Sequence, residues 1–249
     1  GSAVLAVVFA SQLGWTAPQG WHMSHGDFSG RIVGSGQIEA ETRPISGVNG
    51  VAISYPANVR LIQGEDKSIV IEADDNLLPQ LRTEERNGVL VIESCVRGWA
   101  DRVRPTQPVK ITITLADIQV IEMNSAADVT MAELDTPALR VDVSGAGNVT
   151  IGNLTTEMLE TDLSGAGDME VSGSASTVWL SISGAGTFEG EDLHAQTAMI
   201  AISGFGDASL RVSDELTVEI SGAGSVDYYG SPVVHQDVSG LGDVDQNFD

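Results

Sequence analysis

Cysteine and aromatic residues are scarce in this chain. Cys95 is the only cysteine among 249 residues, so no intrachain disulfide can form and the redox compartment stays undecided. We expect Cys95 to be a buried structural thiol, because no histidine or acidic partner motif lies near it. Aromatic residues make up 5% of the chain and there are 28 glycines, which favours a narrow stacked structure over a large globular core.

Basic residues are scarcest in the C-terminal half. Residues 141–249 contain only Arg211 against 18 acidic residues, a net charge of −17 out of −23 for the whole chain. Such a charge argues against nucleic acid or an anionic membrane as a partner. Solubility is its simplest role, and specific cation binding is the alternative.

Long apolar runs are also missing, apart from a short one at residues 3–10. This run is too short to span a bilayer but resembles the apolar region of a secretory signal peptide, with Val8-Phe9-Ala10 as an acceptable cleavage site. Alternatively it adds as a strand to an open sheet edge, in its own or a neighbouring subunit. The residues that would make this contact are Val4, Leu5, Val7, Val8 and Phe9. Both interpretations indicate a location outside the cytoplasm.

The chain divides into three sections. Residues 1–44 form an N-terminal apolar segment and linker, in which His22 and His25 could contact one metal but nothing completes a site. Residues 45–118 show period-2 alternation typical of strands, with a hairpin signal at Asn87-Gly88. One short helical turn is expected at 74–81, capped by Asp75 or Asn76. Residues 119–249 are repeats that continue this all-β section.

A five-residue motif, Ser-Gly-x-Gly followed by a short polar residue, recurs six times in the last section. Its serines are spaced 20, 19, 20, 18 and 18 residues apart, at Ser144, Ser164, Ser183, Ser203, Ser221 and Ser239. A degenerate copy precedes them at Asn124-Ser125-Ala126-Ala127-Asp128. Alternating apolar residues flank each motif, so every period predicts about three short strands with one inward face.

This spacing predicts a parallel β-helix with 18–20 residues per coil. Successive coils would stack strand on strand about 4.8 Å apart, and six or seven copies exceed the minimum for a stable stack. A β-propeller needs about 40 residues per blade, twice the spacing found. We expect the motif glycines to supply φ > 0 and to let neighbouring coils approach closely.

The repeats, behind an all-β section that ends with Val109-Lys110-Ile111-Thr112-Ile113-Thr114-Leu115, resemble the head GIN domain family. The resemblance covers roughly residues 45–245. It implies a right-handed β-helix in an exported or envelope-associated bacterial protein, described as an auto-transporter adhesin. It carries over no catalytic residues.

Three kinds of chemistry could use the repeats. The acidic residues Asp168, Asp207 and Asp243 could form a calcium ladder, but Asn148, Thr187 and Ser225 alternate with them, so turn capping explains all six positions. The six serines form a row, whereas nucleophilic catalysis needs a unique constellation. A β-helix enzyme acting on polysaccharide is the weakest alternative. We therefore expect no enzyme, no cofactor and no metal.

We expect a structural or adhesive protein, extracellular or in the cell envelope of a bacterium, that self-associates, with a filament as one outcome. A cell-surface glycan or a protein receptor could be its further partner. The last repeat has no predicted cap, and Val238, Leu241 and Val244 would pair there with the apolar segment at residues 3–10. The alternative is a module that binds a cell-envelope glycan. Sugars would then stack on exposed rings, for which the candidates are Trp99, Trp179, Tyr228 and Tyr229.

Overall fold

The computed structural model describes residues 31–96, 98 and 102–248, and the chain from Ile32 on forms one unit. The apolar segment at residues 3–10, the pair His22 and His25, and Trp99 lie outside the described residues.

The described part is almost entirely β-structure. Its elements are β1 (Ile32–Val33), β2 (Ile38–Arg43), β3 (Gly50–Ile53), β4 (Asn58–Gln63), β5 (Ser68–Asp74), η2 (Leu78–Gln80), β6 (Leu81–Arg86), β7 (Val89–Ser94), β8 (Val103–Arg104), β9 (Lys110–Leu115), β10 (Val120–Met123), β11 (Asp128–Met131), β12 (Leu134–Asp135), β13 (Ala138–Val143), β14 (Asn148–Leu163), β15 (Asp168–Ile182), β16 (Thr187–Ile202), β17 (Asp207–Ile220), β18 (Ser225–Tyr229), β19 (Val233–Val238) and β20 (Asp243–Asn247).

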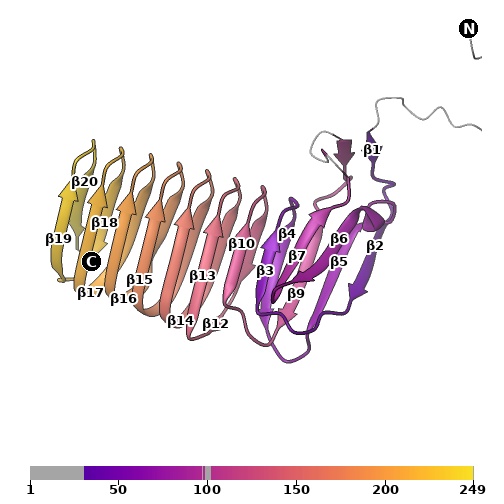
Figure 1. Ribbon diagram of the computed structural model, residues 1–249, viewed down its shortest axis with the longest axis horizontal. Helices are drawn as coiled ribbons and strands as arrows, with labels where there is room; N and C mark the ends of the chain where they lie inside the picture. Colours follow the sequence, from indigo (N-terminus) through magenta and orange to yellow (C-terminus); the bar gives the residue numbers. More distant parts are fainter. Residues whose placement is uncertain (1–30, 97, 99–101, 249) are drawn as a thin grey trace, which may run out of the picture. The chain divides into compact units, whose positions relative to one another are not determined.

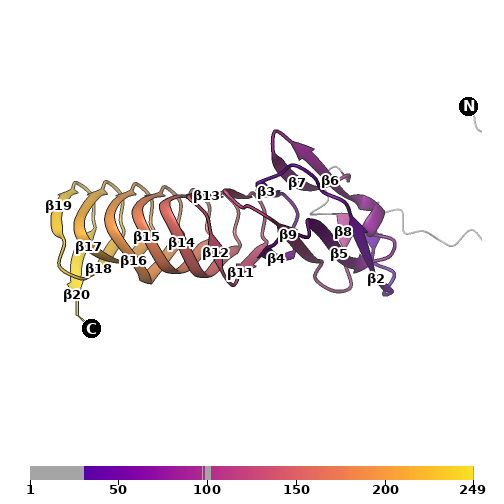
Figure 2. The ribbon, with the colours of Figure 1, turned by 90° about the horizontal axis from the view of Figure 1, so that it is seen from below.

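The repeats form the predicted solenoid of stacked parallel coils (Figure 1). Corresponding residues of successive coils are in register: Val143 pairs with Leu163, Leu163 with Ile182, and Ile182 with Ile202. These steps equal the repeat spacing of the serines. Seen from below, each coil is a flattened loop with strands on two faces (Figure 2).

The expectation of three short strands per coil is wrong for β14 to β17. The strands β14 to β17 contain 16, 15, 16 and 14 residues, because each continues round the second corner of its coil into the next face. Hydrogen bonds between coils persist at that corner: the Thr136 amide donates to the Thr155 carbonyl, and the Glu157 amide to the Pro137 carbonyl. In β14 to β17 only the Ser-Gly-x-Gly corner interrupts the strands, whereas the second corner also separates β12 from β13 and β18 from β19.

The stack begins before the first recognisable repeat. The degenerate copy is confirmed as a coil, since Asp128 of β11 pairs with Asn148 of β14. On its other side β10 and β11 pair in parallel with β3 and β4, which pair in turn with β7 and β9. The strands on both faces of the solenoid therefore continue without a break from the section at residues 45–118 into the repeats at residues 119–249.

At the N-terminal end of the stack the strands turn antiparallel. The strand β5 pairs with β9 and β2 with β5 on one face, while β6 pairs with β7 on the other. Arg43 joins the two faces, because its guanidinium donates to the carbonyls of Leu81 at 2.7 Å and Leu78 at 3.0 Å and bonds the Glu41 carboxylate. Asp74, fully buried, accepts hydrogen bonds from Gly36 and Thr106 and so fastens two loops to this end.

Three local predictions meet different outcomes. The Asn87-Gly88 hairpin is confirmed between β6 and β7, with φ of 53° and 83° at these two residues, as a two-residue turn requires. The helical turn is the 3₁₀ segment η2, but neither Asp75 nor Asn76 caps it: the cap position is Leu77, without a side-chain hydrogen bond. Cys95 is exposed, so the prediction of a buried thiol is wrong.

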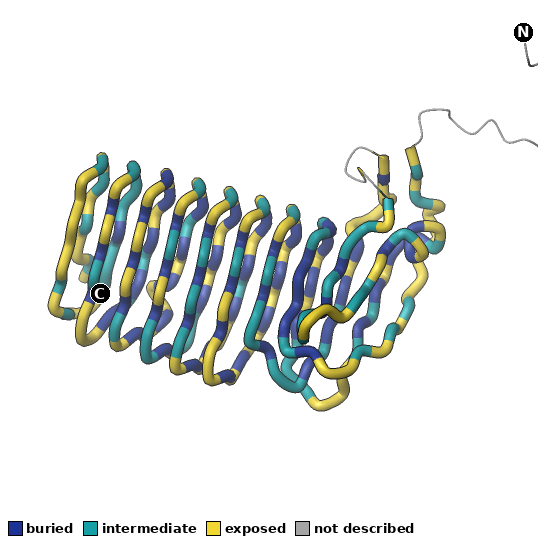
Figure 3. The backbone as a smooth tube through the Cα atoms, in the orientation of Figure 1, coloured by how far each residue is buried: buried dark blue, intermediate teal, exposed yellow. Residues whose placement is uncertain are grey.

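Buried residues recur along the stacked coils (Figure 3), and the apolar ones form one continuous core. Phe188 and Ile200 are completely buried in it. Burial of one such side chain stabilises the fold by about 1.5–3 kcal/mol, and the repeat supplies several per coil. The stack is therefore held together by coil-to-coil burial and hydrogen bonds, with no disulfide.

The glycines of each Ser-Gly-x-Gly corner are required by the close approach of the coils. A Cβ on Gly165 would lie 1.9 Å from the Gly145 carbonyl oxygen, and one on Gly167 would lie 2.3 Å from that of Gly147. The Gly145 oxygen is meanwhile occupied by a hydrogen bond from the Ala166 amide at 3.0 Å. None of the motif glycines lies in the left-handed region, so the predicted φ > 0 is wrong for them, whereas the predicted close approach is confirmed.

Candidate functional site

The turn serines form an exposed row along one corner of the solenoid. All six are exposed, and Ser144 donates through its hydroxyl to Asn124 of the preceding coil at 2.7 Å. His235 lies on a coil face, 3.8 Å from Glu215. In residues 31–96, 98 and 102–248, no three histidine, cysteine or acidic side chains converge as a metal-binding group.

The acidic residues that follow the turns alternate with neutral partners. Asp168 accepts a hydrogen bond from the Thr187 amide at 2.9 Å, and Asp207 accepts two from Ser225, at 2.8 and 2.7 Å. Asn148 donates to Asp128 in the same way at 3.1 Å. Each carboxylate is therefore bonded to a neutral residue of the next coil, and Asp243 occupies the same place in the last described coil.

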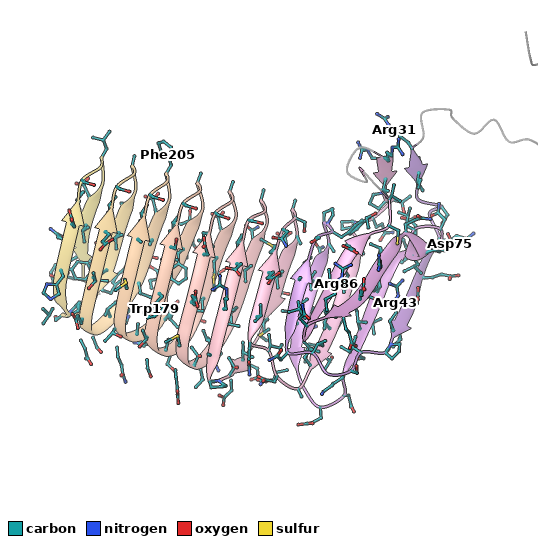
Figure 4. All side chains as sticks on the ribbon, viewed as in Figure 1. Arg31, Arg43, Asp75, Arg86, Trp179 and Phe205 are labelled. Atoms are coloured by element: carbon teal, nitrogen blue, oxygen red, sulfur yellow. The ribbon has the colours of Figure 1, made fainter. Side chains whose placement is uncertain are left out.

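Trp179 is 48% exposed on the outer face of β15, as its alternation with Val178 and Leu180 predicts (Figure 4). Its strand neighbour Met199, with which it is in register, is 53% exposed. The two side chains form a small apolar patch, flanked in the same row by Glu160 and Thr217. A flat ring of this kind can stack on a sugar face or on a protein side chain.

The two tyrosines are less available than Trp179. Tyr228 packs against the core. The Tyr229 hydroxyl donates to the Glu191 carboxylate at 3.1 Å, and this bond raises the pKa of the phenol. The Arg211 guanidinium lies 5.2 Å from the centre of the Tyr229 ring, a cation–π contact. These contacts fix the one arginine of the C-terminal half in position.

The last described coil is formed by β19 and β20. Each pairs with a strand on one side only within residues 31–248, β19 with β17 and β20 with β18. Val238 is 38% and Leu241 88% exposed, while Val244 packs against the core. Polar residues also enter this coil, because Gln236 is in register with the buried Val218. The predicted open coil is therefore partly polar.

A groove of about 1030 Å³ follows the second corner of the coils. One wall is a row of residues in direct register, Asp135, Thr155, Ser174, His194 and Arg211. The other wall contains Pro137, Glu157, Ser176, Gln196 and Ser213. Between the walls lie small buried residues, Thr136, Thr156, Ala175, Ala195 and Val212. Because none is larger than valine, the chain lies close to the core here and the flanking side chains stand as walls.

Sequence reasoning missed this groove. A recurring signal was present: most coils carry a polar residue, a small residue and a second polar residue 8 to 13 positions after the turn serine, as in Ser174-Ala175-Ser176 and His194-Ala195-Gln196. This signal is hard to recognise because the coil that contains β17 is shorter than the one before it. His194 therefore pairs with Arg211 across a register shift.

The chain belongs to the head GIN domain family, described as "putative auto-transporter adhesin", whose family model matches residues 48–232. Among solved structures, a "putative adhesin" from Bacteroides fragilis has a TM-score of 0.82 at 24% identity, and covers 87% of this chain and 100% of its own. A "putative lipid binding protein" from Parabacteroides distasonis has a TM-score of 0.71 at 20% identity, and covers 88% of this chain and 100% of its own. A "putative adhesin" from Parabacteroides merdae has a TM-score of 0.71 at 21% identity, and covers 88% of this chain and 99% of its own.

These structures share the fold with this chain. A search of the curated proteins finds no match. Among the described residues, no helix has the length and apolar character needed to cross a membrane.

Proposed function

We propose that this chain is a non-enzymatic adhesive protein of the bacterial cell surface. The family carries the adhesin description, and a solenoid that repeats each outward position from coil to coil suits multivalent contact with a surface. The outward row formed by Glu160, Trp179 and Met199 is one such set of positions. Weak contacts repeated along a row add up to a large avidity.

Adhesion is tested with beads coated with the purified chain. Coated beads are incubated with host epithelial cells, with mucin and with bacteria, and bound beads are counted against beads coated with albumin. We expect retention on at least one of these surfaces at several times the albumin level. Retention at the albumin level on all of them contradicts the proposed function.

Self-association through the open coil is the finer part of the proposal. The strands β19 and β20 offer unpaired backbone groups on one side within residues 31–248, and Leu241 and Val238 are exposed beside them. A second copy would cover this edge, with its apolar segment at residues 3–10 as the added strand. If each copy both donates this strand to a neighbour and accepts one, the filament expected from the sequence would form.

Two variants test self-association by light scattering. Leu241→Lys at the open coil should reduce particle size, whereas Phe205→Lys should not. The two residues occupy the same corner position and are 88% and 76% exposed, but Phe205 lies within the stack (Figure 4). Deletion of residues 1–13 should have the same effect as Leu241→Lys. An unchanged particle size after that deletion contradicts the donor strand.

A surface glycan is the second candidate partner, on the observation that Trp179 and Met199 are exposed side by side. Pull-down on immobilised cell-envelope glycans with wild type and Trp179→Ala tests it. We expect about tenfold weaker retention without the ring, since stacking and lost contact area amount to about 1.4 kcal/mol. Equal retention of the two proteins contradicts the contact.

A further inference from the structure

We propose that the groove along the second corner binds an extended, uncharged polysaccharide chain. This inference rests on the proposed adhesive function and deepens it by naming a site and a ligand class. The groove passes across six coils, from Asp135 to Ser231. At a strand spacing of about 4.8 Å, five steps give a length of about 24 Å. That length suits a linear polymer rather than a compact small molecule, whose sites are enclosed cavities.

The walls carry the chemistry that recognises hydroxyl groups. Ser174, Ser176 and Gln196 offer neutral donors and acceptors, and His194 adds an imidazole. Because successive coils repeat the arrangement in register, the same pair of walls meets the ligand at each step. A polymer with a repeating pattern of hydroxyls can therefore bond several coils at once.

An extended peptide fits this groove less well. Peptides that bind as strands need free backbone amides and carbonyls at a sheet edge. Here the backbone groups are already used between coils: the Thr136 amide bonds the Thr155 carbonyl, and the Glu157 amide bonds the Pro137 carbonyl. The groove thus offers side chains, and side-chain hydrogen bonding favours a sugar polymer.

Charge restricts the polymer further. Asp135 and Glu157 lie toward one end of the groove, and Arg211 near the other is held by the Tyr229 ring and the Glu191 carbonyl. With a net charge of −17 on residues 141–249, a polyanion is repelled even though Arg211 is present. An uncharged chain meets no such penalty.

Affinity electrophoresis tests the assignment. The full chain is run in native gels that contain mannan, dextran, arabinoxylan or laminarin, with polygalacturonate as the anionic comparison. We expect at least one neutral polymer to retard the chain and polygalacturonate to leave its mobility unchanged. Retardation by none of the neutral polymers, or by polygalacturonate, overturns the proposal.

Paired tryptophan substitutions locate the site. Ser174→Trp fills the groove from an exposed position, and Ser181→Trp places the same ring on the same strand, β15, outside the groove. We expect Ser174→Trp to weaken binding at least about tenfold, which corresponds to about 1.4 kcal/mol, and Ser181→Trp to leave it unchanged. Circular dichroism and thermal unfolding verify that both variants fold. Equal binding by Ser174→Trp and wild type overturns the proposal.

Two further results separate this inference from the functions proposed above. If Trp179→Ala abolishes retardation while Ser174→Trp does not, the sugar lies on the Trp179 patch and the groove is excluded. If coated beads adhere to cells but no neutral polymer retards the chain, the groove proposal fails and adhesion stands. If the beads do not adhere while a polymer binds in the groove, adhesion fails and the binding site stands.

Discussion

At the scale of single residues, the motif glycines fix the distance between coils. Gly165→Ala puts a methyl group where the Gly145 carbonyl oxygen lies 1.9 Å away, so the coils must separate or the corner must shift. We expect the variant to lose about 3 kcal/mol of unfolding free energy, at the upper end of overpacking costs. Urea unfolding measures the loss. Ala166→Ser, one position further on at an exposed site, should change stability by less than about 0.5 kcal/mol. A Gly165→Ala variant as stable as Ala166→Ser contradicts the packing argument.

Asp74 links the N-terminal end of the stack to pH. Burial alone would raise the pKa of this carboxyl group, but hydrogen bonds from Thr106 and Gly36 outweigh burial and hold the pKa below its ordinary value of 3.8. A depressed pKa contributes stability above the ordinary value, and this contribution is lost as the pH falls through the lower, folded value. Asp74→Asn should therefore be less stable than wild type at pH 7, and the gap should narrow below about pH 4. Urea unfolding at pH 7, 4 and 2.5 measures it. A gap that stays constant over this range contradicts the assigned role.

At the scale of elements, the alternation of acidic and neutral residues after the turns keeps like charges apart. Thr187→Asp would place three carboxylates in consecutive coils, between Asp168 and Asp207. We expect a loss of about 1 kcal/mol, which salt should reduce, because directly opposed like charges are destabilising and are screened. Thr187→Asn, which introduces the residue type found at Asn148, should be close to neutral. Thermal unfolding at 20 mM and 500 mM NaCl distinguishes the two variants. Equal salt dependence would mean that the alternation has no electrostatic role.

The strands also show how much of the fold can be predicted from the sequence. The repeat period, the inward rows and the outward Trp179 follow from spacing and alternation, which depend on local chain geometry. The continuous strands β14 to β17 do not, because they depend on hydrogen bonds to neighbouring coils at the corner. The cap of η2 was mispredicted for a similar reason. Asp75 and Asn76 bond instead to Ser35 and Val33, some 40 residues earlier in the chain.

The groove belongs to the same class of long-range feature. Its walls meet only when the coils stack, and the register shift between His194 and Arg211 cannot be inferred from the 18-residue step alone. The motif glycines are predicted in part, because the close approach of neighbouring coils is confirmed and the expected φ > 0 is wrong. Their spacing marks the corner, but the clash that requires them involves the coil before. The sequence therefore predicts the repeat and the stacking of its coils, and it does not predict the register shift or the groove that the stacked coils form.

At the scale of the whole molecule, the two ends of the stack differ. The N-terminal end is closed by antiparallel strands and by Arg43, which bonds the carbonyls of Leu78 and Leu81. The last described coil, like β2 and β6 at the other end, has strand partners on one side only among the described residues, and β19 and β20 contain no buried apolar residue. In a stack of coils stability is nearly a sum of coil and neighbour terms, so a coil with one neighbour opens most easily.

This asymmetry predicts a gradient of amide hydrogen exchange along the chain. In dilute solution the amides of β19 and β20 should exchange fastest, those of β15 and β16 slowest, and those of β5 and β9 should stay protected by their antiparallel partners. Exchange followed by mass spectrometry on peptic peptides resolves these strands.

At higher protein concentration, self-association through the open coil should slow exchange in β19 and β20 selectively. Leu241→Lys should remove that effect, whereas Phe205→Lys should keep it. Uniform protection from β5 to β20 contradicts the gradient, and concentration-independent exchange in β19 and β20 contradicts assembly through this coil.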